Sequence, residues 1–316
     1  MSTALVPPPP PSPRSEPLPG TAFLRVLRRP RGTLWRLLLV IVGVVLGLIV
    51  PPVAVLFAAD GIGRALGTGY SFSLADGVGG VDMLVVNLGL ALLIGWAALL
   101  VRVLYGVRPR WLCSNRPGMR WKWLGICFLV AGVVWALLLF GGTAGALAIR
   151  KAPLDAGVWL FLVVVLVTTP LQAAGEEFLF RGLLLQSFGA PGWPLLVCGP
   201  LDGVLFAVAH LQFDWPLFLD RALLGTVLAF LAGKTAGIES GIAIHSVYNL
   251  SALVPEAFLN RVGQTLEPHA VSFLPLVIHA IQLAIIVPWL LALARRHVGA
   301  TRQLSPPALP PPSFAA

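Results

Sequence analysis

Long apolar runs separated by short polar turns dominate the chain. A helix needs roughly 20 mostly apolar residues to cross a hydrocarbon core about 30 Å thick, and several runs reach that length. The pattern therefore predicts an all-α, polytopic transmembrane helical bundle of about eight spans. The runs cover residues 34–58, 82–104, 122–147, 157–188, 194–211, 217–235, 238–254 and 271–294.

The two ends of the chain differ from this pattern. Residues 1–33 combine a proline-rich stretch with several arginines, and residues 298–316 are again rich in proline. Such compositions do not bury a core. We expect two disordered tails around one membrane-embedded domain at 34–297, whose motif core lies at about 120–255. The first apolar run is too long for a signal-peptide core, so we expect it to remain in the mature protein.

Composition and charge agree with a membrane protein. Hydrophobic residues make up 57% of the chain and charged residues 11%, whereas soluble domains carry roughly 25% charged residues. The net charge of +9 comes from basic residues beside the apolar runs, where the positive-inside rule expects them. We therefore expect the lipid bilayer as partner and no nucleic acid. An even number of spans places both termini on the same side of the membrane. The positive-inside rule predicts that this side is the cytoplasm, so we expect a multi-pass plasma-membrane protein with both termini cytoplasmic.

The three cysteines, Cys113, Cys127 and Cys198, have no paired spacing. They predict neither a disulfide framework nor a zinc knot.

Two acids and a base interrupt the fourth apolar run. Ionisable residues inside a membrane cost roughly 2.5–3.5 kcal/mol each, so each of them needs a reason. Glu177 and Arg181 are four residues apart, share a helix face and can form an ion pair. Glu176 points about 100° away from that face. We interpret the ion pair as structural and Glu176 as a candidate for proton transfer.

Two further runs each carry a polar residue pair at helical spacing. Phe206 and His210 share one face of their helix, and His245 and Asn249 share one face of theirs. Counted from the turn at residues 191–194, Glu176 and His210 lie at the same depth in an antiparallel hairpin. The same count places His245 several turns from His210. Asp202 lies roughly on the face of His210, which makes it a candidate partner of that histidine.

These segments resemble the CPBP family, which groups type II CAAX prenyl endopeptidases with Abi and bacteriocin-immunity proteins. Its motifs Glu-Glu-x-x-x-Arg, Phe-x-x-x-His and His-x-x-x-Asn occur here in that order and on separate predicted spans. The resemblance implies an intramembrane endopeptidase acting on a membrane-associated peptide or protein, with a prenylated CAAX peptide as the substrate that the family name suggests. The motif residues are Glu176, Glu177, Arg181, Phe206, His210, His245 and Asn249.

The resemblance also implies roles for these residues. Glu176 and His210 would activate a water molecule, and His245 and Asn249 would stabilise the oxyanion. Glu177, Arg181 and Phe206 would support the site.

Some alternatives stay open at this stage. Family members are often called metalloproteases, and Glu176, His210 and His245 match a zinc ligand set, so zinc is a candidate cofactor although no cofactor is certain. A non-proteolytic scaffold or a bacteriocin self-immunity protein could keep the same fold. An ion-coupled transporter would also use buried acids and histidines, but the chain shows no repeated half.

Overall fold

The computed structural model describes residues 16–17, 20–29, 32–72, 79–149, 155–258 and 272–298, with the side chains of 138–149 and 256 left undescribed. Within these ranges the regular elements are helices, and an isolated β-bridge joins Ser114 and Gly237. The predicted all-α class is confirmed. Most of the predicted tail regions, residues 1–15 and 299–316, lie outside the described residues.

Each of the eight predicted runs forms a helical segment. Two segments are composite: α2, α3 and the π-helix η2 join into Gly80–Tyr105, and α5, the π-helix η4 and α6 join into Ala156–Gly189. Five segments are long and apolar enough to cross a membrane: Thr33–Ala65, Gly80–Tyr105, Ala156–Gly189, Trp215–Thr235 and Leu274–His297. The protein is therefore a polytopic helical membrane bundle, as predicted.

The helical elements are η1 (Phe23–Arg25), α1 (Thr33–Ala65), α2 (Gly80–Ala91), α3 (Leu93–Leu100), η2 (Val101–Tyr105), η3 (Pro109–Leu112), α4 (Trp121–Ile149), α5 (Ala156–Glu177), η4 (Phe178–Leu184), α6 (Leu185–Gly189), α7 (Leu195–Ala209), α8 (Trp215–Thr235), α9 (Glu239–Phe258) and α10 (Leu274–His297).

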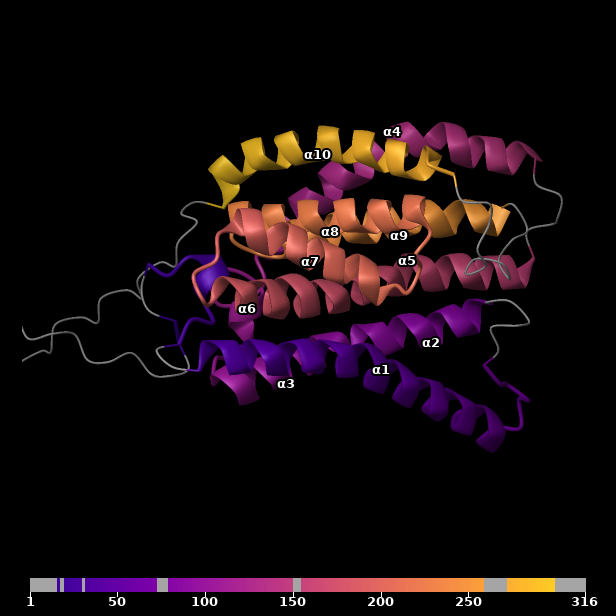
Figure 1. Cartoon of the computed structure of the whole chain (residues 1–316). Coiled ribbons are helices and arrows are strands. Elements are labelled where there is room, and N and C mark those ends of the chain that lie inside the picture. Colours follow the sequence, from indigo (N-terminus) through magenta and orange to yellow (C-terminus); the bar gives the residue numbers. More distant parts are fainter. Residues whose placement is uncertain are drawn as a thin grey trace, which may run out of the picture.

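Helix α5 lies in the middle of the bundle (Figure 1). It packs against α2 on one side and α9 on the other, while α1 covers α2 and α10 covers α4 and α8. Glycine permits the closest of these approaches. A Cβ atom on Gly175 would lie 2.1 Å from the carbonyl oxygen of Leu90, so no other residue fits there without moving a backbone. Gly175 directly precedes Glu176, and this contact fixes the depth of the glutamate.

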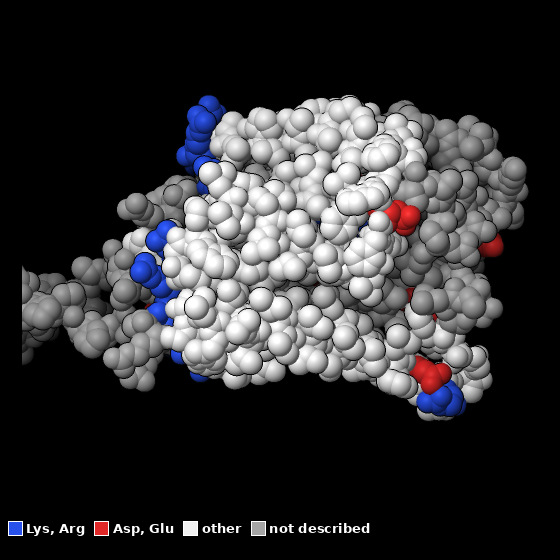
Figure 2. All heavy atoms as spheres, in the orientation of Figure 1, with Lys and Arg blue, Asp and Glu red and all other residues white. Residues whose placement is uncertain are grey.

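The lipid-facing surface is apolar, and the basic residues gather mainly at one end of the bundle (Figure 2), where Figure 1 places the start of α1 and the end of α10. We call this the basic end. Arg64 lies at the other end of α1, where it pairs with Asp60. This separation is the one expected from the sequence. The prediction that the basic end faces the cytoplasm remains a prediction.

The segment 20–29 differs from the predicted disordered tail. Phe23, Val26 and Leu27 are each at most 1% exposed and join the main core. Ahead of them, Glu16 forms ion pairs with Arg108 and Arg110 at 2.9 and 2.7 Å. The average composition of residues 1–33 conceals a short apolar stripe with the i, i+3, i+4 spacing of a helical face, and this stripe packs onto the basic end.

Candidate active site

The two glutamates lie in the last turn of α5, directly before the π-helix η4. Glu176 is 6% exposed and Glu177 is fully buried. Ionised carboxylates at such depth require partners. A π-helical segment changes the direction of side chains relative to an α-helix, and such segments occur often at functional sites.

Glu177 forms the ion pair that the sequence predicts. The Arg181 Nη1 atom donates a hydrogen bond of 2.8 Å to Glu177 Oε1, and both side chains are fully buried. The Arg181 Nε atom also lies 3.3 Å from Asp202 Oδ2. The guanidinium carbon is 4.4 Å from the centre of the Phe206 ring, within the range of a cation–π contact. Arg181 therefore joins α7 to the end of α5.

Asp202 was expected beside His210, and that expectation is wrong. Its carboxylate faces Arg181 instead. Asp202 and His210 are eight positions apart, which corresponds to about 12 Å along a helix. Asp202 therefore lies at the level of Arg181 rather than at the level of His210.

His245 lies between the two glutamates. Its Nδ1 atom is 3.0 Å from Glu177 Oε1, and its Nε2 atom is 3.5 Å from Glu176 Oε2. The side chain is 2% exposed. Since a carboxylate accepts hydrogen bonds, Nδ1 is the nitrogen that donates to Glu177. One imidazole from α9 thus contacts both carboxylates of α5.

Gln172 connects the remaining motif residues and was missed by the sequence analysis. Its Nε2 atom donates to Glu176 Oε1 at 2.6 Å, and its Oε1 atom accepts a hydrogen bond of 2.8 Å from Asn249 Nδ2. Gln172 precedes Glu176 by four residues, so both lie on one face of the helix. That spacing was a signal for a partner of the glutamate.

Phe206 brings the two histidines together. Its ring packs edge-on against His210 and His245, with centroid distances of 4.7 and 5.4 Å. His210 also interacts electrostatically with Glu176. The predicted separation of His245 and His210 by several turns is therefore wrong.

Two features account for the error in depth. His210 follows the last residue of α7, and its ring folds back one turn, so that Nδ1 lies 2.8 Å from the Phe206 carbonyl oxygen. His245 on α9 also contacts both glutamates of α5, an approach between helices that a count along α8 does not give. A carbonyl oxygen can only accept, so His210 Nδ1 carries the proton and Nε2 has the lone pair.

The candidate zinc ligands Glu176, His210 and His245 are residue types that bind zinc, but their arrangement does not form a zinc site. Within the described part of the chain, no three His, Cys, Asp or Glu side chains form a group that could hold a metal ion. Glu177 already pairs with Arg181, and Gln172 donates to one oxygen of Glu176. The described residues therefore offer no assembled metal site.

A second polar cluster lies outside this site. His279 on α10 contacts Asp220 on α8 through Nδ1 at 2.9 Å, and Tyr248 on α9 donates its hydroxyl to the same carboxylate. His279 belongs to none of the three motifs, and these contacts join α8, α9 and α10.

Comparison with known proteins supports the resemblance found in the three motifs. Residues 156–251 match a family model described as "Type II CAAX prenyl endopeptidase Rce1-like". The matched segment begins at the start of α5 and ends within α9, so it contains every motif residue. The predicted CPBP/CAAX protease resemblance is confirmed over this segment.

A curated relative covers a similar length of chain. "Uncharacterized protein YyaK" of Bacillus subtilis (strain 168) is 31% identical over 99 residues, which is 29% of this chain and 33% of the relative. The matched part thus spans a third of the relative's length. No solved structure matches the chain.

Proposed function

We propose that this protein is a glutamate-dependent intramembrane endopeptidase that hydrolyses a peptide bond in a membrane-associated substrate. The observation that carries the proposal is the convergence of Glu176, His210, His245 and Asn249, from three helices, around the ring of Phe206 and the amide of Gln172.

Glu176 is the general base in this proposal. Gln172 donates to its Oε1 atom, while the buried Oε2 atom accepts no hydrogen bond from the described residues. Oε2 is thus the oxygen that can take a proton from water. The hydroxide formed attacks the substrate carbonyl carbon, and the proton passes to the leaving amine when the tetrahedral intermediate collapses.

The other motif residues act on the same intermediate. His210 presents the lone pair of Nε2 and assists Glu176 in activating the water. Asn249 donates to the oxyanion with the N–H that remains after its bond to Gln172. His245 donates to it through Nε2, which requires a proton on Nε2 in addition to the proton that Nδ1 donates to Glu177. Donors of this kind contribute roughly 2.7–4 kcal/mol each in known oxyanion holes.

Glu177, Arg181 and Phe206 support the site. Glu177 and Phe206 contact His245 on two sides, and Arg181 neutralises Glu177. A prenylated CAAX peptide is the first substrate to test, because the matching family model is described as a CAAX prenyl endopeptidase.

The experiment uses the full chain in lipid nanodiscs with a fluorogenic CAAX peptide, farnesylated or unmodified. Glu176→Gln should lower kcat by at least about 100-fold, because it removes the base, and should leave thermal unfolding unchanged. Asp214→Asn is the matched control, since Asp214 is an exposed acid on the loop after α7. Full cleavage by Glu176→Gln would refute the catalytic assignment. A folded wild-type protein that cleaves no membrane-associated peptide would favour a scaffold or a transporter.

A further inference from the structure

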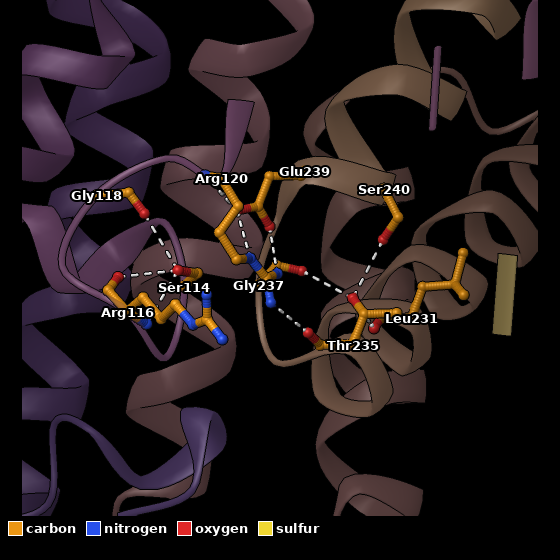
Figure 3. A network of polar contacts seen from close by, with 9 residues as sticks. All are labelled: Ser114, Arg116, Gly118, Arg120, Leu231, Thr235, Gly237, Glu239 and Ser240. Carbon is orange, nitrogen blue, oxygen red and sulfur yellow. Dashed lines mark hydrogen bonds and ion pairs between the residues drawn. The ribbon is translucent and has the colours of Figure 1, made fainter. Parts of the chain in front are cut away.

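The loop between η3 and α4 holds the turn between α8 and α9 at the basic end (Figure 3). Two backbone hydrogen bonds join them: Asn115 N donates to Ala236 O at 2.9 Å, and Ile238 N donates to Cys113 O at 2.9 Å. The isolated bridge between Ser114 and Gly237 lies between these bonds.

Arg120 and Glu239 form the centre of this contact. Arg120 Nε donates to Glu239 Oε1 at 2.8 Å, and Arg120 Nη2 donates to Oε2 at 2.5 Å. The backbone N–H of Arg120 donates to Oε1 as well, at 3.0 Å. The Glu239 side chain is fully buried and that of Arg120 is 10% exposed. A bidentate arginine–carboxylate pair has a fixed geometry as well as a favourable energy.

The pair also joins two helix ends. Arg120 Nη1 donates to the carbonyl oxygen of Thr235, the last residue of α8, at 2.9 Å. Glu239 is the first residue of α9, where a negative charge interacts favourably with the helix dipole. A Cβ atom on Gly237 would lie 2.1 Å from Arg120 Nη2, so the turn has no room for a side chain at this position.

The loop that carries Arg120 is itself held in shape. Ser114 Oγ contacts the carbonyl oxygens of Arg116 and Gly118 at 2.8 and 3.1 Å (Figure 3). The arginine is therefore presented from a fixed loop, and the position of α9 along its axis follows from the loop.

We propose that Arg120 and Glu239 are a positioning pair that sets the axial position of α9 and thereby places His245 and Asn249 against α5. His245 follows Glu239 by six residues, a rise of about 9 Å along the helix. Its contacts with the glutamates, at 3.0 and 3.5 Å, depend on that position. This inference rests on the proposed peptidase function, because it assigns the pair a role in turnover.

A displacement of about 1 Å in a catalytic group can cost about 100-fold in rate. Glu239→Gln and Arg120→Gln should therefore lower kcat about 10- to 100-fold per folded molecule, with KM changed much less. Guanidinium ion should restore part of the activity of Arg120→Ala. A purely structural pair would lower the folded yield and leave kcat per folded molecule unchanged, and that result would overturn the proposal. Arg116→Gln is the matched control, since Arg116 is an exposed arginine of the same loop.

A second measurement does not depend on peptidase activity. Cysteines replace Gln172 and Asn249, whose side chains are 2.8 Å apart, in a chain without the native cysteines, and a short bifunctional thiol reagent joins them. Adding Glu239→Gln should reduce the cross-linking yield several-fold, and adding Arg116→Gln should not. An unchanged yield with Glu239→Gln would overturn the proposal even if the protein is no peptidase. If Glu239→Gln reduces the cross-linking yield but the wild-type protein cleaves no peptide, the proposed function is refuted, while the proposal that the pair positions α9 still holds.

Discussion

Replacing Arg181 tests the buried charge network most directly. Arg181→Met keeps much of the side-chain length but removes the cation that contacts Glu177 at 2.8 Å and Asp202 at 3.3 Å. All three side chains are fully buried. Removing one partner of a buried ion pair costs about 3–5 kcal/mol, because it leaves an uncompensated charge. Here two carboxylates lose their cation, so we expect a loss at the upper end of that range.

The assay is reversible unfolding of the detergent-solubilised protein at increasing fractions of a denaturing detergent. Glu177→Gln added to Arg181→Met should recover part of the lost stability, since it removes one of the orphaned charges. Arg102→Met is the matched control, because Arg102 is an exposed arginine in the other π-helix, η2. Wild-type stability of folded Arg181→Met would refute the argument that this network stabilises the fold.

Four further outcomes are expected. Gln172→Leu should lower kcat more than it raises KM, because both side chains that it bridges lose their partner; equal kcat would contradict the bridging role. Gly241→Ala should impair folding or activity, since its Cβ atom would lie 2.3 Å from Glu177 Oε2; a fully active and stable variant would contradict this close approach. Burial and the hydrogen bond to Asp82 raise the pKa of Tyr70 to about 12. The protonated Tyr70 side chain should therefore contribute to the free energy of unfolding below pH about 10, and this contribution should be lost as the pH rises through the folded-state pKa. In Tyr70→Phe, the free energy of unfolding should fall less over that pH range. Stripping the enzyme with a chelator should leave peptide cleavage unchanged, and loss of activity that zinc restores would establish a metal-dependent reaction.

Local spacing predicted the contacts that lie within one helix. The pairing of Glu177 with Arg181 follows from a separation of four residues, and so does the packing of Phe206 against His210. The eight helical segments followed from hydropathy, because each backbone polar group in lipid must be satisfied within the helix.

Contacts between helices could not be predicted in the same way. The approach of His245 to the glutamates depends on where α9 begins, and the Arg120–Glu239 contact that fixes this start joins residues 119 positions apart. Glu239 lies at the start of the predicted apolar run 238–254, and no basic residue at helical spacing within that run indicates a partner for it. The π-helix after Glu177 also gave no sequence signal, so the direction of the side chains beyond it was not predictable.

That π-helix decides where the central helix can change its length. Each residue removed from an ordinary helix rotates everything beyond it by about 100°. Gln186 donates to the Trp111 carbonyl oxygen, and Ser187 accepts from Tyr105, so both depend on the present rotation. A π-helical turn holds about one residue more than an α-helical turn, so a one-residue deletion within Phe178–Leu184 would convert this segment to α-helix and keep these contacts on their present side. A one-residue deletion should therefore be tolerated better here than in the α-helical turns on either side, where it would turn the contacts away.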